Sequence, residues 1–298
     1  MIQRIKNCIE KYDDILSWKI WEYIKTKSNS FGSFQLWTSL IFTAVFYLPF
    51  LGHGIHKIGF LYFGDVIGLW VPQLFNSHLF NNEFIFKGVD FFTHGGASEY
   101  FLRPNILTYN PLILLLSYII DADNLVRTLR FCFGLFVLHS FLACFFAQKL
   151  CARFLNFDKY LSLFTAVCFS FSLFFINNLG FVPFFFIGCL MPVCIYALLS
   201  CAKKFNITSV LLSSFLIVTI YTSGYLVLSV FVVGVSLIFC CFHFYINNQF
   251  KIRNILRILT PFIIASLITL PLYIAISDFH DIVMPHKKSL AAAAHVLG

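Results

Sequence analysis

The side chains best suited to chemistry lie in one polar stretch, Gly64–Asn110, of an otherwise apolar sequence. Carboxylates and histidines can act as general acids and bases, and basic side chains bind phosphate groups. The stretch contains Asp65, Glu83, Asp90, Glu99, Lys87, Arg103, His78, His94 and the pair Gly95–Gly96. A connection of this length between two helices is uncommon unless it is functional. We therefore place the candidate active site here.

Asp65 follows the aromatic run Phe60–Phe63, which puts a carboxylate at a predicted membrane boundary. There it could deprotonate an acceptor hydroxyl, or help to hold a divalent cation (Mg²⁺ or Mn²⁺) against a phosphate leaving group. The competing interpretation is that Asp65 only caps a helix that starts near Val66, because aspartate is a favoured N-cap residue. Apolar residues at helical intervals predict that this helix reaches about Leu79 and lies flat on the membrane.

The glycine-bounded segment Gly88–Gly96 could bring backbone amides close to a phosphate. It lacks the strand and helix context of a nucleotide-binding loop. His53, His56, His78 and His94 match no standard zinc spacing.

Composition sets the class of the protein. Of its 298 residues, 59% are hydrophobic and 11% are charged, and its mean hydropathy is +0.84. Soluble domains average roughly 25% charged residues, so we predict an all-α, polytopic transmembrane helical bundle with a long helical first outer loop. The net charge of +8 does not indicate nucleic-acid binding, because the basic residues are spread over short loops. The sequence leaves the oligomeric state open.

The predicted elements fall into three regions. Residues 1–33 form a cytoplasmic or interfacial amphipathic segment, and 278–298 form an extracytoplasmic tail that looks like neither a span nor a finished domain. The transmembrane domain is 34–277, with its large outer loop at 56–110. Apolar runs of about 20 residues can cross the hydrocarbon core, and seven are expected near 34–53, 125–148, 160–178, 181–201, 207–223, 225–246 and 255–277. The run 106–120, interrupted by Asn110–Pro111, is expected to be a half-buried or re-entrant helix.

The charges of the loops predict how the spans are oriented in the membrane. Basic residues flank three alternate connections, at Lys149, Arg153 and Lys159, at Lys203 and Lys204, and at Lys251, Arg253 and Arg257. The intervening connections at 177–180 and 223–224 carry no charge. Cytoplasmic loops are enriched in lysine and arginine, so we expect a multi-pass protein of the inner (plasma) membrane. Its N-terminus would be cytoplasmic, and its large loop and C-terminus would lie outside.

The predicted spans carry no mid-span acid, lysine or arginine, which disfavours an ion-coupled transporter. His139 is the one plausible titratable group inside the membrane, and we expect it to hydrogen-bond to a neighbouring helix. Nine of the ten cysteines, from Cys132 to Cys241, fall in or at the ends of apolar runs, and Cys8 lies near the N-terminus. They show no metal-type CxxC pair, so buried, inert thiols are predicted.

One family pattern matches the order of these pieces. The order of four pieces in this loop resembles that in the YfhO-like family of bacterial membrane proteins. These pieces are Gly64–Asp65, a helix and polar stretch over Val66–Asn82, a glycine turn at Asp90–Gly96 and the step Tyr109–Leu112. The resemblance extends over roughly Gln35 to Ile276, and its specific part is the loop. Relatives are typically longer, so a truncated gene product is also considered.

The resemblance implies a C-type (GT-C) integral-membrane glycosyltransferase that transfers a sugar from a polyprenyl-phosphate donor to an extracytoplasmic acceptor. Asp65 would be the catalytic or metal-contacting carboxylate, with Asp90 or Glu99 as a second one. We expect Arg103, Lys87 and His94 to bind the donor, and membrane lipid to surround the bundle. Two alternatives remain: a flippase or exporter component for lipid-linked sugars, and a non-catalytic membrane subunit.

Overall fold

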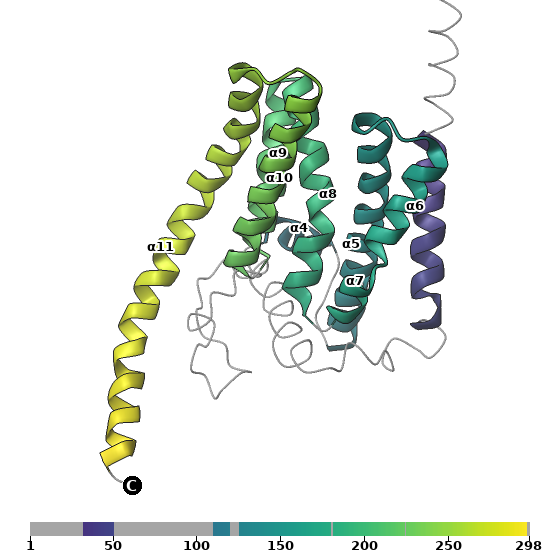
Figure 1. The fold of residues 1–298 in the computed structure, drawn as a ribbon. Helices are drawn as coiled ribbons and strands as arrows, with labels where there is room; N and C mark the ends of the chain where they lie inside the picture. Colours follow the sequence, from purple (N-terminus) through teal and green to yellow (C-terminus); the bar gives the residue numbers. More distant parts are fainter. Residues whose placement is uncertain (1–31, 51–109, 120–124, 180, 224, 297–298) are drawn as a thin grey trace, which may run out of the picture.

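The computed structural model describes residues 32–50, 110–119, 125–179, 181–223 and 225–296 (Figure 1). Within these ranges the regular elements are helices, and no strand is present. The first described helix is Gly32–Phe50, and it is followed by α4 (Pro111–Ile119), α5 (Leu125–Phe154), α6 (Lys159–Ser170), α7 (Leu173–Asn177), α8 (Val182–Lys203), α9 (Ile207–Tyr221), α10 (Leu226–Ile246) and α11 (Ile252–Val296). The all-α prediction is confirmed for the described part of the chain.

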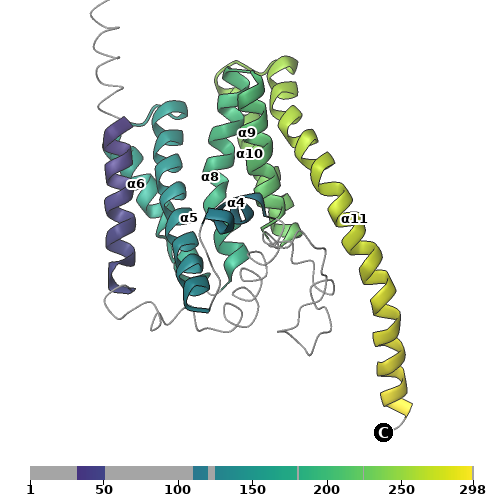
Figure 2. The same cartoon turned by 180° about the vertical axis from the view of Figure 1, so that it is seen from behind.

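Six spans in the described part are long and apolar enough to cross a membrane: Gly32–Phe50, Arg127–Phe154, Lys159–Ile176, Val182–Lys203, Leu226–Ile246 and Ile252–Ile274. The predicted span 207–223 is corrected, because α9 has only 15 residues. At 1.5 Å per residue it is about 22 Å long, against a hydrocarbon core of roughly 30 Å. It still runs between the same two ends of the bundle as α8 and α10 (Figures 1 and 2).

Helix α8 forms the centre of the bundle and packs against α5, α9, α10 and α11. Its apolar residues surround the whole helix, as expected for a helix without a solvent-facing side. Phe185 and Phe186 join one hydrophobic cluster with the first helix, α4, α5 and α7. Leu190 and Leu198 join a second cluster with α9, α10 and α11. Two cores therefore meet on α8.

The outer helices present large apolar side chains on the outside of the bundle. Leu48, Phe164, Phe231 and Leu267, on four different helices, are all well exposed. Exposing so much apolar surface to water would be unfavourable by about 25 cal/mol for each Å². A hydrocarbon surrounding removes this cost, so the exterior fits a multi-pass membrane protein.

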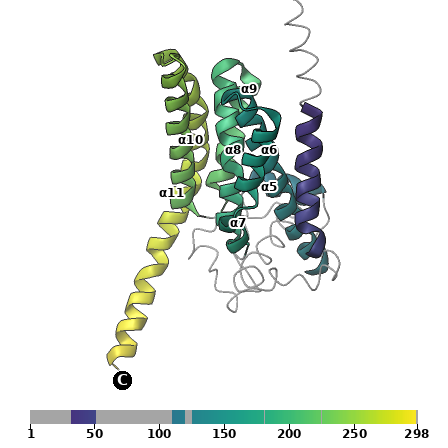
Figure 3. The ribbon, with the colours of Figure 1, turned by 45° about the vertical axis from the view of Figure 1, so that its right-hand side comes forward.

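The loops separate the two ends of the bundle by charge. The connections α5–α6, α8–α9 and α10–α11 lie at one end, which we call the basic end (Figures 1 and 3). The α7–α8 and α9–α10 turns and the C-terminus of the first helix lie at the opposite end, which we call the loop end. All three connections flanked by lysine and arginine thus share one end, as the predicted topology requires.

Short polar caps shape the connections at the basic end. The Asp158 carboxylate accepts hydrogen bonds from the backbone amides of Leu161 (3.0 Å) and Tyr160 (2.8 Å) and so caps α6. These two bonds lower the pKa of Asp158, with the amide of Leu161 contributing most. Asn206 and Ser209 form a reciprocal capping box at the start of α9. These caps keep the basic loops short.

Three predicted spans differ clearly from the helices that the structure contains. Helix α5 continues to Phe154, beyond the predicted end at 148. The predicted span 160–178 is two helices, α6 and α7, with a break at Phe171–Ser172. Helix α11 continues to Val296, well past 277.

Candidate functional site

The predicted site residues lie outside the described part of the chain. Asp65, Lys87, Asp90, His94, Glu99 and Arg103 all fall in the interval 51–109. Their roles, and the divalent cation assigned to Asp65, remain predictions. The described residues do show how the two ends of this interval are attached to the bundle.

Asn110 holds the C-terminal end of the interval, and its side chain is buried. Its Oδ1 accepts hydrogen bonds from the backbone amides of Leu112 (3.1 Å) and Ile113 (3.2 Å), which caps α4. Its Nδ2 donates to the carbonyl of Thr219 (2.9 Å) and to the hydroxyl of Ser223 (3.1 Å) at the end of α9. One amide thus joins the start of α4 to the end of α9.

Further polar side chains converge on the same end of α9. The last carbonyls of a helix have no partner within the helix. The hydroxyl of Ser229, from α10, donates to the carbonyl of Ile220 (2.7 Å), and that of Tyr273, from α11, donates to the carbonyl of Tyr221 (2.5 Å). Together with Asn110 and Ser223 they form what we call the α9 junction. It connects α4, α9, α10 and α11 at the loop end.

The N-terminal end of the interval follows the first helix, which is held to α5 by buried hydrogen bonds. The hydroxyls of Tyr47 and Ser140 lie 2.9 Å apart. Nearer the basic end, the Gln148 amide donates to the Ser39 hydroxyl (2.8 Å). Inter-helix hydrogen bonds of this kind stabilise helix pairs in lipid, where water offers no alternative partner. The first helix therefore ends at the loop end, and Asn110 is held at the α9 junction.

His139 does not make the predicted hydrogen bond to a neighbouring helix. Its Nδ1 donates to the carbonyl of Leu135 in its own helix (2.7 Å). Its contact with α8 is a ring stack on Phe186, with centroids 4.0 Å apart and an interplanar angle of 8°. Among the described residues, the partner is thus a carbonyl of the same helix, four residues earlier. A histidine engaged in this way is a packing residue.

The cysteine prediction is largely confirmed. Seven of the described cysteines are buried, and no disulfide joins any of those in the described ranges. Cys168 is exposed and Cys241 is partly exposed. Cys8 lies outside the described residues. Within the described chain, no group of three or more His, Cys, Asp or Glu side chains could hold a metal ion.

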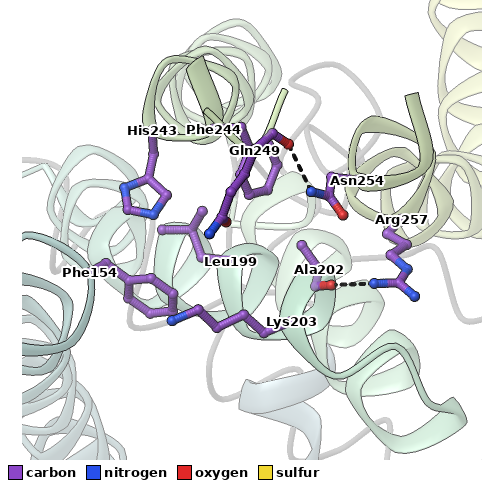
Figure 4. Close-up of a pocket in the computed structure, with 9 residues that line it drawn as sticks. All are labelled: Phe154, Leu199, Ala202, Lys203, His243, Phe244, Gln249, Asn254 and Arg257. Atoms are coloured by element: carbon purple, nitrogen blue, oxygen red, sulfur yellow. Dashed lines mark hydrogen bonds between the residues drawn. The ribbon is translucent and has the colours of Figure 1, made fainter. Parts of the chain in front are cut away.

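A cavity of about 200 Å³ opens at the basic end (Figure 4). Its wall combines basic, amide and aromatic side chains from α5, α8, α10, α11 and the α10–α11 connection: Phe154, Leu199, Ala202, Lys203, His243, Phe244, Gln249, Asn254 and Arg257. The Lys203 ammonium lies over the Phe154 ring, 4.7 Å from its centroid. Arg257 donates from Nη1 to the carbonyl of Ala202 (2.8 Å).

Sequence reasoning missed this cavity, because it read the basic loops only as markers of topology. Lys203 and Arg257 lie on helices that the sequence places far apart, and only the packing of α11 on α8 brings them together. The sequence shows the basic residues of this cavity, but it does not show that they line the same cavity.

Comparison with protein-family models, with curated proteins and with solved structures finds no match for this chain.

Proposed function

We propose that the protein is a membrane glycosyltransferase that moves a sugar from a polyprenyl-phosphate donor to an acceptor on the loop-end side of the membrane. One observation carries this reading. The described helices on either side of 51–109, which contains the chemically equipped side chains, are held by buried polar contacts of Tyr47 and Asn110, and the chain leaves the first helix at the loop end. That end is opposite the basic loops, and by the positive-inside rule this supports an extracytoplasmic position for it.

The roles follow from the chemistry of the transfer. Asp65 accepts the proton of the acceptor hydroxyl as its oxygen bonds to the anomeric carbon. The bond from that carbon to the phosphate oxygen breaks, and the prenyl phosphate leaves. Asp90 or Glu99 is the second carboxylate. These hard oxygen donors suit Mg²⁺ or Mn²⁺, which would neutralise charge on the leaving phosphate.

A polyprenyl-phosphate donor needs basic side chains for its phosphate and an apolar surface for its prenyl chain, both on the same side of the membrane. Arg103, Lys87 and His94 are the candidate phosphate contacts, and arginine can contact a phosphate bidentately. The prenyl chain would lie against the apolar exterior of the bundle. Transport is less well supported, because acids, lysines and arginines are absent from the central turns of the described spans.

A matched pair of carboxylate variants tests the function. Asp65→Asn is expected to reduce release of prenyl phosphate from a synthetic sugar donor by about 10²–10⁴-fold, the usual effect of losing a general base. Asp158→Asn is the control, because asparagine still caps α6 at the opposite end of the molecule. Thermal unfolding of both purified proteins should stay near wild type. Full activity of Asp65→Asn together with lower thermal stability would mean that Asp65 is only a helix cap.

A further inference from the structure

Two cavities lie side by side at the basic end, and Arg257 lines both. The first is the polar cavity of about 200 Å³ described above. The second is a groove of about 340 Å³ along the first turns of α11, lined by Phe205, Ile252, Arg253, Leu256, Arg257 and Thr260. A polar basic cavity and a groove with three apolar side chains in its wall therefore meet at Arg257.

Arg257 has a structural role that leaves part of its side chain available. Its bond to the Ala202 carbonyl caps the end of α8, where the helix dipole favours a cation. A guanidinium carries five N–H donors, and this bond uses one of them. The guanidinium also lies over the Phe205 ring, 5.6 Å from its centroid. These contacts fix its position at the boundary between the cavity and the groove.

The positive charges at this place have no described carboxylate beside them. Among the acidic residues, only the side chain of Asp158 is described, and it caps α6. Arg253 lies one turn before Arg257 on the same face of α11. Lys203 reaches the cavity from α8. The cluster is therefore strongly positive and complementary to an anion.

The groove beside these charges is suited to a hydrocarbon chain. Phe205, Ile252 and Leu256 are all well exposed. They lie beside an end of the candidate spans, where headgroups and acyl chains of a bilayer would meet. An isolated phosphate ion would use the basic cavity but would leave this apolar wall unfilled. A lipid uses both, and anionic lipids are attracted to basic residues at this depth by about 1 kcal/mol for each residue.

We propose that the cavity and groove form a binding site for an anionic glycerophospholipid of the bilayer. Its phosphate is held by Arg257 and Arg253, with Lys203 and His243 facing the headgroup from the cavity. The first part of one acyl chain lies in the groove against Leu256 and Thr260. The site is at the end of the bundle opposite the proposed glycosyltransferase site and does not depend on that activity.

Lipid retention measures this site directly. The full chain is reconstituted in nanodiscs of equimolar phosphatidylglycerol and phosphatidylcholine and then extracted, and its bound lipid is counted by native mass spectrometry. We expect wild type to retain phosphatidylglycerol in preference. Arg253→Ala and Arg257→Ala should each lower the ratio of the two lipids about five-fold. Arg253 makes no contact that caps a helix, so its variant separates binding from folding.

Two controls and a competition identify the ligand. Lys251→Ala removes a charge from the same connection outside both cavities, and should leave the ratio unchanged. Thr260→Trp fills the groove and should lower retention, whereas Ile263→Trp, one turn further on, should not. Equal retention of both lipids by wild type, or equal effects of Arg253→Ala and Lys251→Ala, would overturn the site. Binding of inorganic phosphate is measured by ³¹P NMR. If this binding is saturable and is abolished by Arg257→Ala, and if Thr260→Trp does not change lipid retention, the site binds a soluble phosphate instead of a lipid.

Discussion

The side chain of Asn110 serves two helices through its two ends. Its oxygen caps α4, and its nitrogen holds the end of α9 through Thr219 and Ser223. The Thr219 carbonyl also accepts from the Ser223 hydroxyl (2.6 Å), so replacing the Asn110 amide removes two hydrogen bonds without leaving this carbonyl unpaired. A typical hydrogen bond contributes about 0.5–1.5 kcal/mol. Asn110 is also the first described residue after the predicted active-site interval. Its contacts therefore fix the start of α4 to the end of α9.

Substitutions at Asn110 should separate its two roles. Asn110→Ala loses both the cap and the bonds to α9, and should destabilise the protein by about 2–3 kcal/mol. Asn110→Ser keeps a capping oxygen and loses the bonds to α9, so we expect a smaller loss. Thermal unfolding in detergent gives the order.

Asn178→Ala is the control for this series. The Asn178 side chain also bonds to a backbone carbonyl, that of Phe174, but within a single turn and without joining two helices. If Asn110→Ala and Asn178→Ala had the same effect, the connection between α4 and α9 would not contribute to stability.

Sequence reasoning found the step at Asn110–Pro111 but not its partners. A proline tolerated in the first turn and a preceding asparagine mark a helix start in any sequence. Thr219 is distant in sequence, and one chain without relatives carries no signal that pairs the two. The same holds for Tyr47 and Ser140. The elements were therefore easier to predict than the polar contacts between them.

At the scale of elements, the contact between α7 and α8 depends on a glycine. A Cβ added at Gly188 would lie 2.9 Å from Cε1 of Phe175, and Phe175 is itself buried. The absence of a side chain at Gly188 lets the short helix α7 pack against α8. Phe175 also meets Phe185 edge to face, with ring centroids 5.8 Å apart. Gly188 thus determines where α7 can lie.

Gly188→Ala should destabilise the protein by about 1–3 kcal/mol, the usual cost of overpacking a core. Gly234→Ala, inside α10, is the matched control because a Cβ there meets nothing within 4 Å. Alanine has the higher helix propensity, so this control should be neutral or stabilising by up to roughly 1 kcal/mol. Both are measured by thermal unfolding in detergent. Equal effects of the two variants would show that α7 moves aside without cost.

Helix bounds were predicted well where an apolar run ends at a turn. The expected spans 181–201 and 225–246 are α8 and α10 within one or two residues. Helix α5 was predicted too short because hydropathy falls at its charged end while the helix continues. There Lys149 lies over the Phe145 ring, 4.2 Å from its centroid, so the charged turn is stabilised by aromatic contacts.

At the scale of the whole molecule, the two ends differ in charge and in content. The basic end carries three short loops, two of which contain a helix cap, and the loop end carries the C-terminus of the first helix and the α9 junction. The loops alternate between the two ends only if α9, although short, connects one end of the bundle to the other. The bundle therefore predicts one orientation, which can be measured at positions on each end.

Cysteine labelling in a cysteine-free background tests this orientation in intact cells. Cysteines placed at Ser98, in the predicted outer loop, and at Tyr225, exposed in the α9–α10 turn, should react with a membrane-impermeant maleimide. A cysteine at Lys204 should react only after permeabilisation. The reverse pattern would put the interval 51–109 in the cytoplasm, where the proposed donor site could not work.

The shortness of α9 affects the lipid as well as the protein. Leu211, Leu212 and Phe215 leave one side of α9 exposed, yet the helix is about 8 Å shorter than a hydrocarbon core of roughly 30 Å. A bilayer meets such hydrophobic mismatch by thinning locally, at a cost of fractions of a kcal/mol for each ångström. Headgroups beside α9 would then sit deeper than elsewhere around the bundle. On the loop-end side this depression would border the α9 junction, where the interval 51–109 ends.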